Sequence, residues 1–303
     1  MKASGVLRVA ALALIWGSGF LFIKISLRGF TPVQLTFARL ALGAIVLTVI
    51  VLASRRRLPA GRRVWLHLIV AALFANAIPY TLFGVAEQTV TSNLAGAINA
   101  TTPLWTVLFA LLFGRHDPLR LAQWAGMVLG FAGALLILSP WQADSAPIGG
   151  VLACLGASAS YGVSYVYMSR YLTNRGLPPI VLSAAQLIAA SGLLALAAPF
   201  GGLTAPTWRP DAILGLAILG VLGTGVAYVI NYRIISDDGP VLASTVTYLL
   251  PVVAVVLGFA VLDETITVQL VLGVIIVLTG VALTRRKPAE APNHISAGAK
   301  QPT

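Results

Sequence analysis

Long apolar runs alternate along the chain with short polar or charged segments, and this pattern predicts a bundle of transmembrane helices. A helix needs about 20 mostly apolar residues to cross the hydrocarbon layer of a bilayer. Ten runs reach about that length, each bounded by charges or turn residues. We therefore expect ten transmembrane helices, at residues 6–26, 33–53, 65–85, 91–113, 120–139, 148–170, 179–199, 211–232, 239–261 and 266–284.

The second half of the chain repeats the pattern of the first. The run Thr91–Phe113 has no charged residue and carries Pro103 at its middle, where a proline removes a backbone donor and kinks a helix. The run Gly239–Val261 has Pro251 at the equivalent position. Such self-similarity indicates a duplicated chain, an architecture common among transporters. The same register pairs Tyr80 with Tyr228 and, with one residue dropped, Gly126 and Gly133 with Gly273 and Gly280.

Charges at the ends of the runs predict the orientation in the membrane. Cytoplasmic loops carry an excess of Lys and Arg. If the N-terminus is cytoplasmic, most basic residues fall on the cytoplasmic side, so both termini are expected there. Each half has five runs, an odd number, so the second half must be inverted relative to the first. The outside then receives only Arg28 and Arg209 as basic residues, beside the acidic Glu87, Asp144, Asp211, Asp263 and Glu264.

We accordingly expect an all-α integral membrane protein, built as two inverted five-helix repeats around a central cavity. The repeats comprise residues 1–140 and 148–287, joined by the short polar turn PWQADSAP at 140–147. The run after Arg8 continues as a full span, so we interpret it as a retained helix and not as a signal peptide. The tail at 288–303 has no apolar period and is predicted to be disordered.

Composition supports the membrane assignment. Of the 303 residues, 58% are hydrophobic and 10% are charged, with a mean hydropathy of +0.91. Soluble proteins carry about 25% charged residues. The net charge of +11 resides at the ends of the apolar runs and not on one face, so we expect lipid and not nucleic acid as the partner. Cys154, the single cysteine, excludes a disulfide within the chain and is expected to be a buried, inert thiol.

Several short motifs resemble one transporter family. The opening Trp16-Gly17-Ser18-Gly19-Phe20, followed by Lys24, resembles the WGSxF…K opening of the EamA-type transporters, which belong to the drug/metabolite transporter superfamily. Pro32 with Arg39 resembles the second-span pattern of that family. Leu94–Pro103 and the glycine-spaced span after it resemble its fourth and fifth spans. The resemblance covers nearly all of residues 6–284.

The second half departs from the opening motif, because Tyr161 and Ser169 stand where Trp16 and Lys24 stand in the first half. The resemblance implies an exporter or facilitator of small metabolites, with a central cavity between the halves.

Polar side chains at helical spacing give the candidate site, since polar groups in hydrocarbon need partners or water. Thr101, Thr102 and Trp105, for example, share one arc of roughly 100° on the fourth span. The fifth and tenth spans carry almost nothing polar and should lie outside. The candidate solute-binding residues are Trp16, Lys24, Arg39, Asn76, Tyr80, Asn99, Thr102, Trp105, Tyr161, Tyr165, Tyr228, Ser244 and Tyr248; the same stripes include Phe20, Thr224, Asn231 and Thr247.

Each candidate also has a purely structural interpretation. Ser and Thr in membrane helices often bond their own backbone, and mid-span aromatic residues can simply pack in the core. Lys24 lies near the outer end of its span and can extend to the headgroups. Arg39 lies about 10 Å deep and would bond either backbone carbonyls at a broken helix or a solute carboxylate. Pro79, Pro103 and Pro251 are candidate hinges.

Some side chains are missing where other functions would need them. We expect no Asp or Glu inside the hydrocarbon layer, and the histidines lie at span ends or in the tail. This argues against obligatory proton coupling and against export of cationic drugs. It also argues against an intramembrane serine hydrolase or metalloenzyme, so we expect no catalytic residues, metal or cofactor. No phosphate-binding glycine loop is present either.

These features favour a secondary transporter of the bacterial inner membrane that exports or equilibrates small metabolites. We expect amino acids, including aromatic ones, carried by alternating access without obligatory proton coupling. The alternatives are export of cationic drugs or nucleotide sugars, an intramembrane enzyme, and a scaffold without a water-filled cavity. Gly126 and Gly130 form a GxxxG pair, which we expect to pack within a monomer, with a dimer contact as the alternative.

Overall fold

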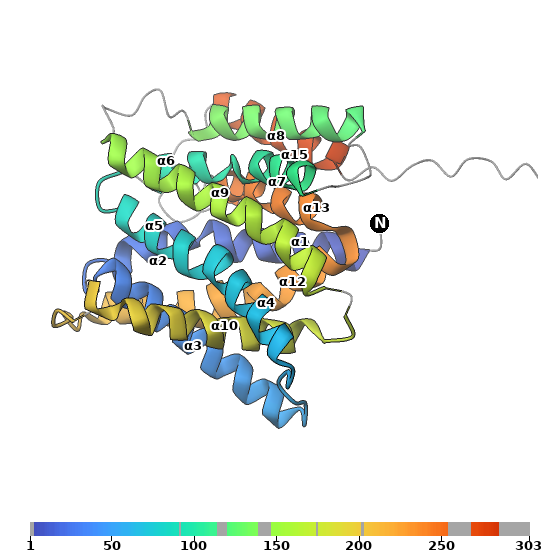
Figure 1. Ribbon diagram of the computed structural model, residues 1–303. Helices are drawn as coiled ribbons and strands as arrows, with labels where there is room; N and C mark the ends of the chain where they lie inside the picture. Colours follow the sequence, from blue (N-terminus) through green and yellow to red (C-terminus); the bar gives the residue numbers. More distant parts are fainter. Residues whose placement is uncertain are drawn as a thin grey trace, which may run out of the picture.

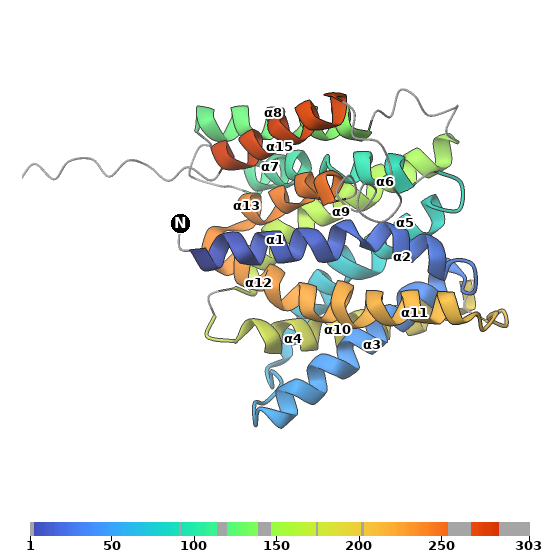
Figure 2. The same ribbon diagram turned by 180° about the vertical axis from the view of Figure 1, so that it is seen from behind.

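The described part of the chain forms a helical bundle in which the helices run in roughly one direction and its reverse (Figures 1 and 2). This computed structural model describes residues 3–90, 92–113, 120–138, 147–173, 175–200, 203–253 and 268–284, and these ranges contain no β-strand. The predicted join at 140–147, apart from Pro147, and the predicted tail at 288–303 lie outside the described residues.

The first half contains α1 (Ala3–Gly17), α2 (Gly19–Ser26), α3 (Pro32–Ala53), α4 (Arg62–Ala72), η1 (Leu73–Ala77), α5 (Ile78–Ala86), α6 (Ser92–Asn99), α7 (Thr102–Leu112) and α8 (Leu121–Leu138). The second half contains α9 (Ile148–Tyr171), α10 (Pro179–Ala197), η3 (Ala198–Phe200), α11 (Pro210–Ile218), η4 (Leu219–Val226), α12 (Ala227–Asp238), α13 (Pro240–Ser244), η5 (Thr245–Leu249) and α15 (Val268–Thr284).

Six continuous helical stretches are long and apolar enough to cross a membrane: Gly5–Ser26, Pro32–Ala53, Arg62–Ala86, Ile148–Tyr171, Pro179–Ala197 and Pro210–Asp238. Each coincides with a predicted span. The other four predicted runs contain shorter apolar helices, and residues 254–261 of the ninth run are not described. Large apolar side chains on the outside, such as Leu7 and Leu196, are more than 70% exposed, as lipid-facing residues are in a bundle without its membrane.

The third and eighth spans each contain a π-helical segment at mid-length, η1 and η4. Pro79 explains the first of these: it has no N–H to donate to the carbonyl of Ala75, and its ring crowds that carbonyl. In η4 the sequence LGVLGTGV is rich in glycine, and α3 approaches it closely at Gly43. A Cβ on Gly43 would lie only 3.0 Å from the carbonyl oxygen of Gly220. Such π segments free backbone carbonyls for other donors.

The fourth and ninth spans are also interrupted. The helix breaks at residues 100–101, between α6 and α7, and Pro103 stands in the first turn of α7, where a proline is tolerated. In the ninth span the 3₁₀ segment η5 precedes Pro251, within the helical stretch Pro240–Val253. In the register that pairs Pro103 with Pro251, these two interruptions coincide.

α8 and α15 lie side by side at one edge of the bundle in both views, as expected for the fifth and tenth spans (Figures 1 and 2). Glycines allow this close contact. A Cβ on Gly126 would lie 2.6 Å from the oxygen of Gly280, and one on Gly133 would lie 2.9 Å from the oxygen of Gly273. In the repeat, Gly126 is equivalent to Gly273 and Gly133 is equivalent to Gly280, so each of these contacts is the counterpart of the other. The predicted GxxxG pair therefore packs within the chain.

α1 and α9, the first helices of the two halves, run in opposite directions. α1 leads away from the labelled N-terminus towards α2, whereas α9 begins on the side where α2 ends (Figures 1 and 2). Residues from both halves consequently meet along the middle of the bundle, where the site described next is found.

Candidate functional site

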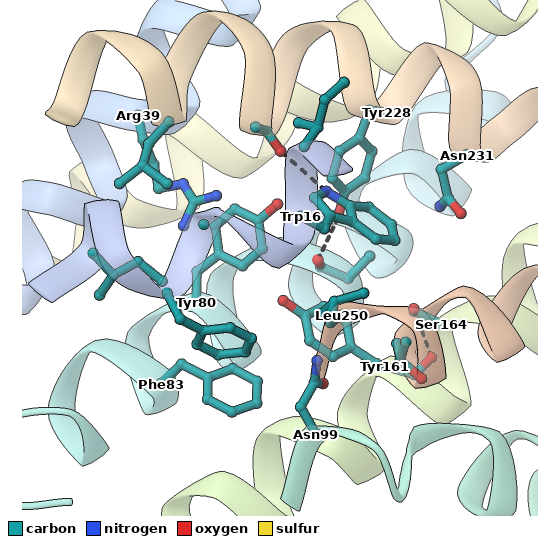
Figure 3. A pocket seen from close by; sticks show the side chains of 18 of the residues that line it. Trp16, Arg39, Tyr80, Phe83, Asn99, Tyr161, Ser164, Tyr228, Asn231 and Leu250 are labelled. Atoms are coloured by element: carbon teal, nitrogen blue, oxygen red, sulfur yellow. Dashed lines mark hydrogen bonds between the residues drawn. The ribbon is translucent and has the colours of Figure 1, made fainter. Parts of the chain in front are cut away.

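A central cavity lies between the two halves of the chain, and its atom-free space, including open solvent at its mouth, is about 780 Å³ (Figure 3). Its lining comes from the first, second, third, fourth, sixth, eighth and ninth spans. Seven predicted site residues contribute to it: Trp16, Arg39, Tyr80, Asn99, Tyr161, Tyr165 and Tyr228. The lining also includes Phe20, Asn231 and Thr247 from the predicted stripes, together with Phe83 and Ser164, which the sequence did not single out.

Arg39 is the charged residue of this lining. Its side chain is 7% exposed, and its Nε donates a 3.1 Å hydrogen bond to Oγ1 of Thr224. The guanidinium carbon lies 4.0 Å from the centre of the Tyr80 ring, a cation–π contact. No carboxylate in the described ranges forms an ion pair with Arg39. A buried cation without a protein counter-ion therefore faces the cavity.

Aromatic rings form the walls of the cavity in two equivalent pairs. Trp16 and Tyr228 meet edge to face at 6.4 Å and 67°, and Tyr161 and Tyr80 do so at 6.5 Å and 70°. In the repeat, Trp16 is equivalent to Tyr161 and Tyr228 is equivalent to Tyr80, so the two pairs are counterparts. Phe83 extends the second pair, because its ring stacks on Tyr161 at 6.1 Å. Flat apolar surfaces thus surround the space beside Arg39.

Donors from each half bond the carbonyls that the π-helical segment of the other half frees. Trp16 Nε1 donates to the oxygen of Gly223 in η4 at 3.1 Å. Ser160 Oγ donates to the oxygen of Phe74 in η1 at 2.7 Å, and the Tyr228 hydroxyl donates at 2.5 Å to the carbonyl of Ala75, to which Pro79 has no N–H to donate. The cavity wall is thereby held against both π segments.

Gln186 on α10 is a polar residue that the sequence analysis missed. It is fully buried, its Nε2 donates to Oδ1 of Asn76 at 2.7 Å, and its Oε1 accepts a hydrogen bond from the Tyr232 hydroxyl. It does not line the cavity. The pattern that could have found it is the repeat itself, because pairing Pro32 with Pro179 places Gln186 at the position of Arg39.

The EamA-like transporter family matches this chain twice, over residues 3–139 and 148–286. The chain belongs to the EamA-like transporter family. It is 31% identical over 293 residues to the uncharacterized inner membrane transporter YedA of Escherichia coli K12, covering 93% of each chain. It is 28% identical over 290 residues to an uncharacterized transporter of Archaeoglobus fulgidus, covering 95% of this chain and 99% of the relative.

A crystal structure with 24% sequence identity shares the fold, with a TM-score of 0.74 over 93% of this chain and 96% of the other. Together with the apolar spans, the family and these relatives identify a multi-pass membrane transporter of small molecules. The family and these relatives are transporters and not enzymes.

Six of the predicted site residues of this EamA-like transporter lie outside the cavity lining: Lys24, Asn76, Thr102, Trp105, Ser244 and Tyr248. Lys24 is exposed, and its Nζ donates to the backbone oxygen of Glu87 at 2.7 Å. Thr102 and Ser244 are buried and donate to the carbonyls of Asn99 and Val241, three residues earlier. Their hydroxyls therefore bond the local backbone.

The other three of these residues pack inside the bundle. Asn76 belongs to the network of Gln186. Trp105 stacks on Phe109 at 6.3 Å, and its Nε1 donates to Oγ1 of Thr101. Tyr248 is fully buried, and a Cβ on Gly130 would lie 2.6 Å from its ring. The arc drawn from a regular helical period does not continue across the breaks in the fourth and ninth spans.

Glu87, which the charge pattern assigned to the outer side, is buried within the bundle, with 0% of its surface exposed. It caps the C-terminal end of α5, directly after the third membrane-spanning stretch. The start of α9 covers this turn: a Cβ on Gly150 would lie 2.6 Å from Val90 and 3.7 Å from the oxygen of Ala86. Glu87 is consequently a buried acid at the end of a span, although it is not part of the cavity lining.

Proposed function

We propose that this transporter carries small carboxylates of the amino-acid type, including aromatic amino acids, across the bacterial inner membrane. The observation that supports this proposal is Arg39, a buried guanidinium that faces the cavity and has no carboxylate partner among the described residues. A buried charge is costly unless it is paired. A solute carboxylate would supply that pair through charge-assisted hydrogen bonds, which arginine can form in a bidentate way.

The walls of the cavity favour a solute with an apolar or aromatic part. Trp16, Tyr80, Phe83, Tyr161 and Tyr228 offer ring faces and edges, and aromatic rings stack favourably on such surfaces. We propose the aromatic amino acid exporter YddG as a family member with a similar solute, because the motifs of this chain resemble it.

We propose alternating access between two inverted repeats, residues 1–140 and 148–287, as the mechanism. Several observations support it: the family matches each half, α1 and α9 run in opposite directions, and contacts such as Trp16 with Tyr228 recur as Tyr161 with Tyr80. Breaks near Pro79, Pro103 and Pro251 would let the halves of a helix move separately. Since Gly126 and Gly130 pack within the chain, the repeats need no second copy, and we propose a monomer.

Transport in this proposal does not require a proton. The cavity lining in the described ranges contains no Asp, Glu or His, the side chains that usually bind a coupled proton. The same composition disfavours cationic drugs, which need an acidic partner. Nucleotide sugars carry two phosphates and would favour a more basic cavity than one arginine provides.

The test is competition for the uptake of labelled phenylalanine into proteoliposomes that contain the purified protein. Three competitors differ at one group: phenylalanine itself, phenylalanine amide without the carboxylate, and phenethylamine, which is a cation only. We expect only the acid to compete effectively. Equal competition by the amine would support the cationic-drug alternative. A nucleotide sugar is tested as a fourth competitor, and inhibition by it alone would support the nucleotide-sugar alternative. Uptake that appears only under an imposed pH gradient would contradict the uncoupled mechanism.

A further inference from the structure

Asn231 on α12 is a buried polar side chain whose amide makes no hydrogen bond within the described part of the chain. The residue is 4% exposed and lines the cavity, and its Oδ1 is buried without a partner. A buried, unpaired polar group costs about 1–3 kcal/mol, and the large majority of buried side-chain polar atoms in folded proteins have a partner. An unpaired amide in the wall of a binding cavity therefore indicates a group that awaits a ligand.

Three other polar side chains of the lining already have hydrogen-bond partners. Ser164 Oγ donates to the oxygen of Tyr161, and Thr247 Oγ1 donates to the oxygen of Ser244. Oδ1 of Asn99 accepts a hydrogen bond from Thr102. Asn231 is thus distinct from them in chemistry as well as in position.

Asn231 lies at the end of the cavity opposite to Arg39. Thr224, Tyr228 and Asn231 form one stripe along the eighth span, and Arg39 bonds Thr224 at its start. Seven residues of helix separate Thr224 from Asn231 by about 10 Å. Figure 3 shows Arg39 and Asn231 at opposite sides of the view, with Trp16 and Tyr228 between them. The cavity therefore has a cationic end at Arg39, aromatic walls at Trp16 and Tyr228 in its middle, and an amide at Asn231 at its other end.

The two halves differ at this point. The register that pairs Tyr80 with Tyr228 pairs Phe83 with Asn231, and both residues line the cavity. Phe83 stacks on Tyr161 at 6.1 Å, so the first half presents a ring where the second presents an amide. An amide in place of a ring adds nothing to aromatic packing. Its contribution has to come from hydrogen bonding.

We propose that Asn231 is a specificity-determining residue that binds a hydrogen-bonding group at the far end of the solute. The solute class is elongated carboxylates with an aromatic middle and a distal O–H or N–H. This inference rests on the proposed function, because it needs the solute carboxylate to lie at Arg39. It goes beyond that function by predicting which carboxylates are preferred.

The test compares solutes that differ only in the distal donor, in competition against labelled phenylalanine in proteoliposomes. The pairs are tyrosine with phenylalanine and tryptophan with 1-methyltryptophan, whose indole N–H is blocked. With the native chain, we expect the donor-bearing member of each pair to compete about tenfold better, the effect of one good hydrogen bond. Asn231→Leu, which is similar in size and apolar, should reduce both ratios to about one.

Two further variants distinguish hydrogen bonding from a change of shape. Asn231→Asp keeps the acceptor oxygens and should retain the preference for tyrosine while raising competition by lysine, which carries a distal cation. Thr245→Val is the matched control, because Thr245 is buried outside the cavity lining and its hydroxyl already bonds the oxygen of Leu242, and it should keep the native ratios. The ratio is the readout, so a variant with less folded protein is still informative.

The outcomes separate this inference from the proposed function. Carboxylate-dependent uptake with no preference for the distal donor in the native chain would overturn the role of Asn231 and leave the proposed function intact. Native ratios that persist in Asn231→Leu would overturn it as well. Failure of every amino acid to compete would overturn both.

Discussion

Arg39 and Gln186 occupy the same position in the two halves of the chain, yet one faces the cavity and the other is enclosed. Each reaches from its helix to a π-helical segment of the other half. Arg39 Nε donates to Thr224 at 3.1 Å, and Gln186 Nε2 donates to Asn76 at 2.7 Å. The register that pairs Tyr80 with Tyr228 also pairs Asn76 with Thr224. The two hydrogen bonds are therefore equivalent.

Their surroundings differ. Gln186 is 0% exposed, and the hydroxyl of Tyr232 bonds its remaining oxygen, so its amide has protein partners on both sides. Within the described ranges, the Arg39 guanidinium contacts Thr224 and the Tyr80 ring, and Arg39 lines the cavity. The comparison indicates that duplication supplied two polar cross-links, of which one became a closed structural contact and the other kept its open donors for a solute.

The largest effect is expected from Arg39→Gln, which gives the first half the side chain of the second. Hydrogen bonds to charged groups contribute about 1.5–3 kcal/mol, so uptake of a carboxylate at low concentration should fall roughly 10- to 150-fold. The measurement is initial uptake of labelled phenylalanine into proteoliposomes. Arg28→Gln is the matched control, because Arg28 is exposed, 3.4 Å from Asp211, and remote from the lining.

Arg39→Lys sharpens the same experiment. Lysine keeps the charge but loses the planar fork of donors, so we expect partial recovery of uptake relative to Arg39→Gln. If Arg39→Gln and Arg28→Gln behaved alike, with equal amounts of folded protein, the assignment of Arg39 to the solute carboxylate would be wrong.

Gln186→Leu should affect stability and not solute choice. It leaves Asn76 and the Tyr232 hydroxyl buried without their partners, at a cost of about 2–4 kcal/mol in the free energy of unfolding. Thermal or denaturant unfolding in detergent measures this loss. Ser191→Ala, on the same helix and bonded only to the carbonyl of Leu187, is the control and should change stability by less than about 0.5 kcal/mol. If folded Gln186→Leu ranked the competing solutes in a different order, the assignment of Gln186 to structure and of Arg39 to solute binding would be wrong.

Tyr80 is expected to have an intermediate effect, because its ring supports the guanidinium from one side. Cation–π contacts contribute roughly 0.5–2 kcal/mol, so Tyr80→Leu should weaken carboxylate binding about two- to thirtyfold. Tyr80→Phe keeps the ring and should retain most of the affinity. Competition curves for phenylalanine measure both variants. Equal losses in the two variants would show that the hydroxyl, and not the ring, supports Arg39.

The sequence was sufficient for the six long membrane-spanning stretches, because a segment that lies in lipid must be long, apolar and nearly free of charge. The repeat register related equivalent positions, such as Gly126 with Gly273 and Tyr80 with Tyr228, but it did not predict the contacts that the structure shows between Gly126 and Gly280 and between Tyr80 and Tyr161. Which side chains face the cavity was harder to predict. A π-helical segment such as η1 inserts an extra residue into a turn, which rotates everything after it relative to a regular period.

Residues after such breaks show the consequence. Trp105 and Tyr248 were placed on polar arcs drawn with 3.6 residues per turn, but the break at residues 100–101 and the 3₁₀ segment η5 change the phase before them. Gln186 was overlooked for another reason: a lone glutamine has no distinctive pattern until the helices it joins are known. Arg39, by contrast, was identifiable because charge is rare in a span.

The smallest effects are expected at the donors that bond the freed carbonyls, Trp16 in the first half and Ser160 in the second. Trp16→Phe removes the bond to Gly223 and Ser160→Ala removes the bond to Phe74, each costing about 0.5–1.5 kcal/mol in the free energy of unfolding. Only Trp16 lines the cavity, so only Trp16→Phe should alter the competition profile, by about threefold or less. Unfolding and competition measured on the same preparations separate the two roles. A shift in solute preference with Ser160→Ala would indicate that the π segment in the third span is coupled to solute binding. The contrast between Arg39, which faces the solute, and the enclosed Gln186, which serves structure alone, would then be wrong.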